Sequence, residues 1–137
     1  MTWSRSGTGP AGVTLSQSVD VADVAAVESA VREIHDVVGT LDVVIFNSGI
    51  TNDGLAIRMS EEQWRNVLST NLDGAFHTAK HTPPDLIKKR AGTLLFVSSV
   101  SPFMGVPGQA NYSASKAGLI GLARSLASEV ARRGVTV

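Results

Sequence analysis

The apolar and polar positions of the chain alternate between short β-rich runs and longer stretches with helical spacing. Residues 12–19 predict a first strand. Residues 41–46 and 93–97 predict two strands buried on both faces, because these runs are almost continuously apolar. Residues 135–137 predict the beginning of a further strand. Strands that alternate with helices in this way are typical of a parallel α/β sheet.

The first predicted helix begins after Asp23, whose side chain can accept hydrogen bonds from the free N–H groups of the first turn. Gly39 predicts its end. Between these two positions, apolar residues recur at helical spacing at Val24, Val27, Val31, Ile34 and Val38. A last helix is predicted over residues 111–132, and Gly134 closes it.

A middle helix is predicted from the pair Ser60 and Gln63, which has the spacing of a capping box. Its predicted buried stripe comprises Trp64, Val67, Leu68, Leu72, Ala75 and Phe76. The pair Pro83-Pro84 is expected to bend or end this helix. Right-handed crossovers would then place all strands in one sheet with helices on both faces, and ligands of such sheets bind at the carboxyl ends of the strands.

Composition narrows the class of protein. The 137 residues suit one domain, 43% are hydrophobic, and twelve Lys and Arg balance twelve Asp and Glu. This balance gives no reason to expect nucleic acid or a membrane surface as a partner. There is no cysteine, so neither disulfides nor thiolate metal sites are possible, and we expect no metal. Because the start is polar and no run is long enough to span a membrane, a soluble cytoplasmic protein is expected.

Tyr112 and Lys116 form the strongest chemical signal. They are four residues apart near the start of a predicted helix, so both side chains lie on one face. A free tyrosine has a pKa of about 10, and a neighbouring ammonium group favours the phenolate form. Such a pair can act as an acid and base near neutral pH. Taken alone, the same spacing also fits a half-buried tyrosine beside a solvated lysine.

Two further polar residues occur where chemistry is expected. Ser99 follows a predicted strand, where its hydroxyl could donate to a substrate carbonyl oxygen, although a serine in a turn is equally ordinary. Asn71 lies on the apolar side of the middle helix. A buried amide needs partners, so Asn71 either satisfies backbone groups at a helix irregularity or holds a water molecule.

Together these residues resemble the short-chain dehydrogenase/reductase family. Asn47-Ser48-Gly49, Asn71, Ser99 and Tyr112-x-x-x-Lys116 have the order and spacing of that family. Residues 47–76 and 105–122 resemble its 3-oxoacyl-[acyl-carrier-protein] reductase branch in particular. The resemblance covers roughly residues 19–137. It implies an α/β fold, a partial Rossmann-like doubly wound parallel sheet formed by residues 1–137 as one incomplete domain.

The resemblance also implies roles for the catalytic residues. Tyr112 would match the residue that protonates the developing alkoxide, and Lys116 the residue that assists it and holds the nicotinamide ribose. Ser99 would match the residue that polarises the substrate carbonyl. Asn71 would match the residue that anchors a water molecule feeding protons to the lysine.

The implied cofactor is NADP(H). Asp20 and Val21 resemble the pair beside the adenine ring, and Asn47, Ser48 and Gly49 resemble the turn along the adenosine, with Ser48 in place of the usual alanine. Tyr112 and Lys116 would also contact the cofactor. Arg5 would match the basic residue that binds the 2′-phosphate, since a guanidinium suits a phosphate dianion; it could equally be a disordered terminal arginine.

The resemblance breaks off at both ends. No glycine-rich turn that would seat the pyrophosphate precedes Arg5, and the family's first strands and carboxyl-terminal strands are expected to be missing. Weak cofactor binding and little turnover are therefore expected of the chain by itself. Small residues of the last helix, Ala114, Gly118, Gly121 and Ser125, would permit the close helix packing of a homo-oligomer.

Arg90 and Arg133 are candidates for docking an acidic acyl carrier protein, although cations at helix carboxyl ends are favourable in any protein. Three functions follow as alternatives. The first is NADP(H)-dependent reduction of a 3-keto acyl thioester in fatty acid synthesis, and the second is reduction of another carbonyl substrate by a related branch. The third is a catalytically silent remnant that serves as an oligomerisation or interaction module.

Overall fold

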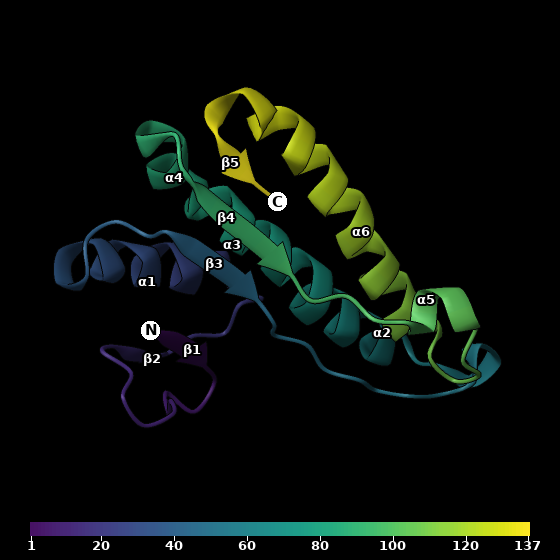
Figure 1. Cartoon of the computed structure of the whole chain (residues 1–137). Coiled ribbons are helices and arrows are strands. Elements are labelled where there is room, and N and C mark those ends of the chain that lie inside the picture. Colours follow the sequence, from purple (N-terminus) through teal and green to yellow (C-terminus); the bar gives the residue numbers. More distant parts are fainter.

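The computed structural model describes residues 1–137, in which strands and helices alternate (Figure 1). The strands are β1 (Thr2–Ser4), β2 (Ser16–Ser18), β3 (Val43–Phe46), β4 (Gly92–Phe96) and β5 (Val135–Thr136). The helices are α1 (Val24–Val37), α2 (Glu61–Leu68), α3 (Gly74–His81), α4 (Pro83–Lys89), α5 (Ser101–Met104) and α6 (Ala110–Val130). A π-helical turn spans Ser69–Asp73, and 3-10 turns span Ala56–Arg58 and Ala131–Arg133.

The strands pair only in parallel. β3, β4 and β5 form one sheet in that order, with Ile45 opposite Leu95 and Thr93 opposite Thr136. β1 and β2 form a separate pair, which lies apart from the larger sheet in Figure 1. The α/β class with a partial Rossmann-like parallel sheet is thus confirmed. The prediction of one continuous sheet was wrong.

The two sheets are separated by a groove of about 450 Å³. Met1, Thr2 and Trp3 line one side of it, and residues 43–46 of β3 line the other. The backbone edges of β1 and β3 therefore face this space without hydrogen-bonding to each other. Nine of the fourteen lining residues are hydrophobic, which makes the groove a largely apolar surface.

The predicted first strand, residues 12–19, is shorter than expected, and β1 was not predicted at all. β1 lies in a polar, glycine-containing stretch with no strand pattern of its own. It forms because Thr2, Trp3 and Ser4 pair with residues 16–18. The indole nitrogen of Trp3 also donates to the side-chain oxygen of Gln17 at 2.6 Å. This strand is specified by a partner fourteen residues away, which a local pattern does not reveal.

The ends of α1 confirm the cap prediction. A carboxylate oxygen of Asp23 accepts from the backbone N–H groups of Ala25 and Ala26 at 2.9 and 3.2 Å. The helix ends just before Gly39, whose φ of +87° is a conformation that glycine adopts easily. The face of α1 that is buried comprises Val27, Ala30, Val31 and Ile34. Val24 and Val38 are exposed, so the predicted stripe is correct in its middle and wrong at its ends.

The predicted middle helix divides into three pieces. The capping box is present, because Ser60 and Gln63 each accept the other's backbone N–H through a side-chain oxygen. α2 then ends at Leu68, and the π-helical turn leads into α3. Phe76 is half exposed instead of buried. Pro83 does end the helical run, and it also begins α4, since proline is well suited to the first turn of a helix.

Two apolar clusters hold these elements together. The first joins residues before and within α1 to the middle of α6 and comprises Val19, Val21, Val27, Ala30, Phe46, Ala75 and Leu119. The second lies toward the opposite end of the sheet and comprises Ile34, Leu41, Leu86, Leu94, Val130 and Val135. α6 contributes Leu119 to one cluster and Val130 to the other. It ends as predicted before Gly134, whose φ is +70°.

One face of the larger sheet is open, contrary to the prediction that its strands are buried on both faces. Val43 and Ile45 are two residues apart on β3, so they point to the same face of the sheet, where they are 54% and 60% exposed. Leu95, opposite Ile45 on β4, is also exposed. No element of the chain covers these side chains. None of the helices is long and apolar enough to cross a lipid bilayer.

The open face leads to a prediction about assembly. Contiguous exposed apolar side chains and unpaired strand edges favour association, so we expect the purified chain to form dimers or larger species. Replacing Ile45 and Leu95 together by threonine should shift light scattering toward the monomer at micromolar concentration. Threonine at exposed Val24 on α1 is the matched control and should leave the mass unchanged. A monomeric parent chain would contradict this prediction.

Candidate active site

The candidate catalytic residues come from three segments. Asn71 belongs to the π-helical turn, Ser99 follows β4, and Tyr112 and Lys116 lie in the first two turns of α6. The loop after β3 lies beside them, because Ile50 contacts Asn71 directly. As predicted for parallel α/β sheets, the polar side chains meet where the strands end at their carboxyl termini.

Asn71 is fully buried and all its polar atoms are used. Its side-chain oxygen accepts from the N–H of Ile50 at 2.8 Å. Its nitrogen donates to the carbonyl of Ile50 at 3.0 Å and to the hydroxyl of Ser115 at 3.0 Å. Of the two interpretations left open above, the structure shows the first, an amide that satisfies backbone groups at a helix irregularity.

Tyr112 and Lys116 share one side of α6, as their spacing predicts. The Lys116 ammonium lies 5.8 Å from the centroid of the Tyr112 ring. It donates to the carbonyl of Val97 at 2.8 Å, so one of its three N–H groups is used. The residue is only 3% exposed. This burial lowers the pKa of Lys116 below its ordinary value of 10.5, because removal from water disfavours the charged form.

Ser99 is half buried and bonds within its own loop. Its hydroxyl donates to that of Ser101 at 3.3 Å and accepts from the backbone N–H of Ser101 at 3.1 Å. It makes no hydrogen bond to Tyr112 or Lys116. The structure therefore joins Asn71 to the Tyr112 helix through Ser115, whereas Ser99 is held by the start of α5.

Three residues that support the site were not predicted. The buried hydroxyl of Ser115 receives a hydrogen bond from Asn71 and donates to the carbonyl of Tyr112 at 2.7 Å. The Ser98 hydroxyl donates to the carbonyl of Lys116 at 2.9 Å. Asn111 is fully buried directly before Tyr112. The adjacency of Ser115 and Asn111 to the candidate pair was the available signal, since a polar residue on a buried helix side needs a partner.

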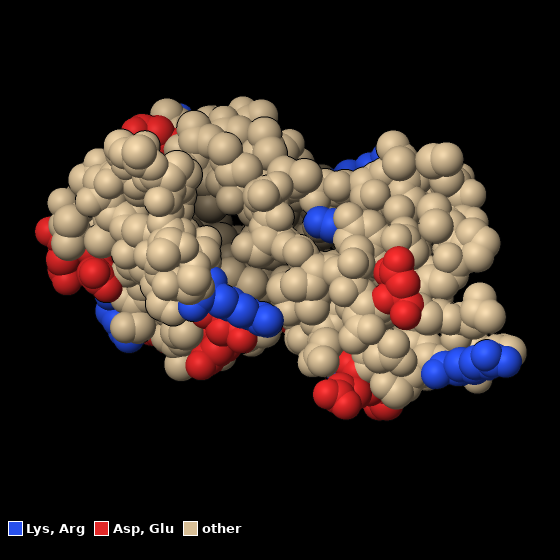
Figure 2. Space-filling model, turned by 90° about the horizontal axis from the view of Figure 1, so that it is seen from below, with Lys and Arg blue, Asp and Glu red and all other residues tan.

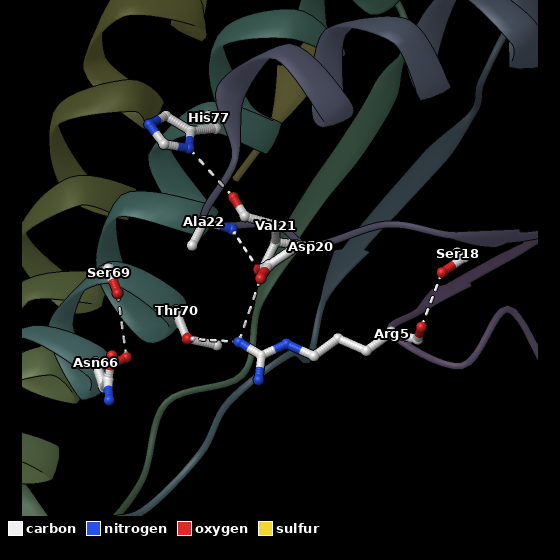
Figure 3. A network of polar contacts seen from close by, with 9 residues as sticks. All are labelled: Arg5, Ser18, Asp20, Val21, Ala22, Asn66, Ser69, Thr70 and His77. Carbon is white, nitrogen blue, oxygen red and sulfur yellow. Dashed lines mark hydrogen bonds and ion pairs between the residues drawn. The ribbon is translucent and has the colours of Figure 1, made fainter. Parts of the chain in front are cut away.

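Arg5, Asp20 and Val21 meet at a second cluster, shown in Figure 3. The Arg5 guanidinium lies 3.5 Å from the Asp20 carboxylate and donates to the Thr70 hydroxyl at 3.4 Å. Asp20 also accepts from the backbone N–H of Ala22. Arg5 thus lies between Asp20 and the π-helical turn. Thr70 lies next to Asn71, so the π-helical turn connects this cluster with the candidate catalytic residues.

The turn after β3 contains Asn47, Ser48 and Gly49. Asn47 and Ser48 line the groove between β1 and β3. Gly49 lies against the candidate catalytic residues Lys116 and Asn71 instead. A Cβ atom at Gly49 would be 3.3 Å from the Lys116 ammonium and 3.5 Å from the Asn71 side-chain oxygen. The lack of a side chain therefore leaves space directly beside these two groups.

Arg90 and Arg133 lie at one corner of the molecule. Arg90 ends α4, and its guanidinium donates to the carbonyl of Arg132 at 2.7 Å. The two segments pack so closely that a Cβ atom at Gly134 would overlap the carbonyl of Arg90. Elsewhere charges of both signs are interspersed, as on the face in Figure 2. No group of three or more His, Asp or Glu residues is arranged to hold a metal ion.

The burial of Lys116 predicts how stability depends on pH. Its pKa is lower in the folded than in the unfolded chain, so between the folded value and 10.5 the unfolded chain binds more protons. The free energy of unfolding therefore gains a contribution as pH rises through this window. Denaturant unfolding of the parent and of Lys116→Met should show a difference that grows toward pH 10.5 and then levels off. Lys80→Met, at an exposed lysine of α3, is the control, and its free energy of unfolding should change with pH as that of the parent does. A Lys116→Met variant that also follows the parent would contradict this prediction.

Comparison with known proteins agrees with this geometry. The family described as short chain dehydrogenase matches residues 9–137. The chain is similar to 3-oxoacyl-[acyl-carrier-protein] reductase FabG of Staphylococcus aureus (strain Mu50), with 45% identity over 118 residues, 86% of this chain and 48% of the relative. The FabG of Escherichia coli (strain K12) is 44% identical over 119 residues, 87% of this chain and 49% of the relative. The chain spans about half the length of these relatives, and it belongs to the short-chain dehydrogenase family.

Proposed function

We propose that this chain carries the catalytic residues of an NADP(H)-dependent reductase that converts a 3-oxoacyl thioester into the 3-hydroxyacyl thioester. The main support is the pairing of Tyr112 with a buried Lys116 ammonium 5.8 Å from its ring, backed by the buried hydrogen bond between Asn71 and Ser115. The similarity to the FabG reductases supports the choice of substrate class.

The residues present fit a nicotinamide cofactor. Gly49 leaves space beside the Lys116 ammonium, which has two N–H groups not used within the protein. Two hydroxyls of a ribose are suitable acceptors for such donors. On the other side, the Arg5 guanidinium is 61% exposed and held near Asp20, in a position to bind a phosphate group. When bound, NADP(H) supplies the hydride that reduces the carbonyl carbon.

The protein's own residues would transfer the proton to the substrate. The Tyr112 hydroxyl donates its proton to the carbonyl oxygen as negative charge develops there. The Lys116 ammonium then stabilises the phenolate that remains, across the 5.8 Å to the ring. The Ser99 hydroxyl can turn from Ser101 toward the same oxygen, since hydroxyl protons rotate freely. Asn71 holds the loop after β3 against α6 so that these groups keep their relative positions.

A second function has one observation in its favour. The open face of the larger sheet and the groove beside β3 are surfaces on which other polypeptides could pack. A catalytically silent chain that acts only as an oligomerisation module would need these surfaces and not the Tyr112–Lys116 pair. Titration of NADPH against the purified chain distinguishes the two functions, because only the reductase requires binding.

The first prediction concerns Tyr112. With millimolar NADPH, a concentrated sample of the chain and an acetoacetyl thioester, oxidation of NADPH should depend on protein concentration. Tyr112→Phe should lower kcat by about 10²- to 10⁴-fold, because it removes the proton donor and keeps the ring. NADPH binding, followed by fluorescence, should change little.

Phe76→Leu is the control for a change in an aromatic side chain, since Phe76 is half exposed on α3 and is not one of the candidate site residues. It should leave kcat within about twofold of the parent value. A Tyr112→Phe variant as active as Phe76→Leu would contradict the catalytic role of Tyr112. A parent chain that binds no NADPH would favour the oligomerisation module.

We also propose that the corner formed by Arg90 and Arg133 binds the acidic carrier of the acyl group. Its support is the packing of the two helix ends, which brings two arginines from distant parts of the sequence together. The two guanidinium groups outweigh the partial negative charge of the helix carboxyl ends, so the corner is positive. Complementary charge of this kind mainly accelerates and orients the encounter with a partner.

The carrier prediction is tested by binding, without need for turnover. Arg90→Glu with Arg133→Glu should weaken binding of an acyl carrier protein by at least about tenfold at low salt, and the difference should shrink at high salt. Arg32→Glu with Arg124→Glu makes the same change in net charge at exposed positions elsewhere. If both double variants lose binding equally, net charge alone accounts for it and the corner has no special role.

A further inference from the structure

Asn111 occupies an unusual position beside the candidate acid. It is fully buried, it directly precedes Tyr112, and it lies in the first turn of α6. The residue before this helix, Gln109, provides no side-chain cap. The first N–H groups of α6 therefore lack the capping that Asp23 and Ser60 provide for α1 and α2.

The Asn111 amide connects three segments. Its nitrogen donates to the carbonyl of Asn52, in the loop after β3, at 2.9 Å. The same nitrogen donates to the carbonyl of Gln63, in α2, at 3.2 Å. Its oxygen accepts from the backbone N–H of Tyr112 at 2.8 Å. One buried side chain thus fixes the start of α6 to two other elements.

Neighbouring contacts join the same segments independently of Asn111. Gln63 donates through its side chain to the side-chain oxygen of Asn52 at 3.1 Å, so the two segments that Asn111 joins are also joined to each other. The N–H of Gly54 donates to the carbonyl of Gly108 at 2.9 Å. The other side-chain contact of the Tyr112 backbone is at its carbonyl, which accepts from the Ser115 hydroxyl at 2.7 Å.

We propose that Asn111 is a positioning residue for Tyr112. It sets the place of the Tyr112 backbone, and so of its hydroxyl, relative to the loop that carries Gly49 and Ile50. Together with Asn71, which holds the same loop through Ser115, Asn111 attaches the first two turns of α6 to this loop. The proposal rests on the catalytic role proposed for Tyr112, although its test does not need turnover.

Tyr112 is the only tyrosine of the sequence, which makes it a site-specific probe. Incorporation of 3-fluorotyrosine gives one ¹⁹F resonance, which reports the surroundings of this one ring. In Asn111→Ala, which removes both donors and the acceptor, we expect a shifted or broadened resonance. Asn66→Ala, at an exposed asparagine of α2, should keep the resonance of the parent.

Asn111→Ser keeps one hydroxyl able to reach one partner, so it should lie between the parent and Asn111→Ala. Circular dichroism establishes that each variant is folded. A folded Asn111→Ala variant with the parent's resonance overturns the proposal. If every Asn111 variant unfolds, the residue supports the whole fold instead, which also overturns it.

Where the chain oxidises NADPH, Asn111→Ala should lower kcat by up to about a hundredfold with little change in KM, because a displaced proton donor affects the reaction more than binding. Failure of turnover in the parent would count against the proposed function alone. An unchanged ¹⁹F resonance in the Asn111 variants would count against the role of Asn111 alone.

Discussion

The buried amide of Asn71 is the interaction on which the site depends. It satisfies the N–H and the carbonyl of Ile50 at once and reaches the Ser115 hydroxyl, so three segments meet at one side chain. An amide without partners in this place would leave several buried polar groups unsatisfied, at a cost of about 1–3 kcal/mol each. The π-helical turn at Ser69–Asp73 is the local irregularity in which Asn71 lies, and such turns often occur at functional sites.

Local chemistry explains why the ends of helices were predictable from the sequence. Asp23, the pair Ser60 and Gln63, and Gly134 act on backbone groups within a few residues, so their effect can be read without knowing the fold. The spacing of Tyr112 and Lys116 belongs to the same class, because four residues on one helix fix their relative direction. β1 and the π-helical turn could not be predicted in this way, since each depends on partners distant in the sequence.

Burial was less predictable than secondary structure. The continuous apolar run of residues 41–46 predicted a strand buried on both faces, yet Val43 and Ile45 are exposed because nothing in the chain covers that face. Phe76 likewise continues the apolar stripe of its helix and lies half in solvent. A sequence pattern shows which side of an element is apolar. Whether another element packs there is a property of the assembled fold, and the same holds for the separation of β1 from β3.

The site uses backbone atoms of the loops more than their side chains. Lys116 donates to the carbonyl of Val97, Asn71 binds the backbone of Ile50, and Asn111 donates to the carbonyl of Asn52. The fixed polar side chains therefore lie mainly on helices, while the loops contribute their main chain. Such a site can accept Ser48 in place of the family's usual alanine, provided that the backbone of the loop keeps its path. Gly49 is the exception, because a Cβ atom there would fill the space beside the Lys116 ammonium.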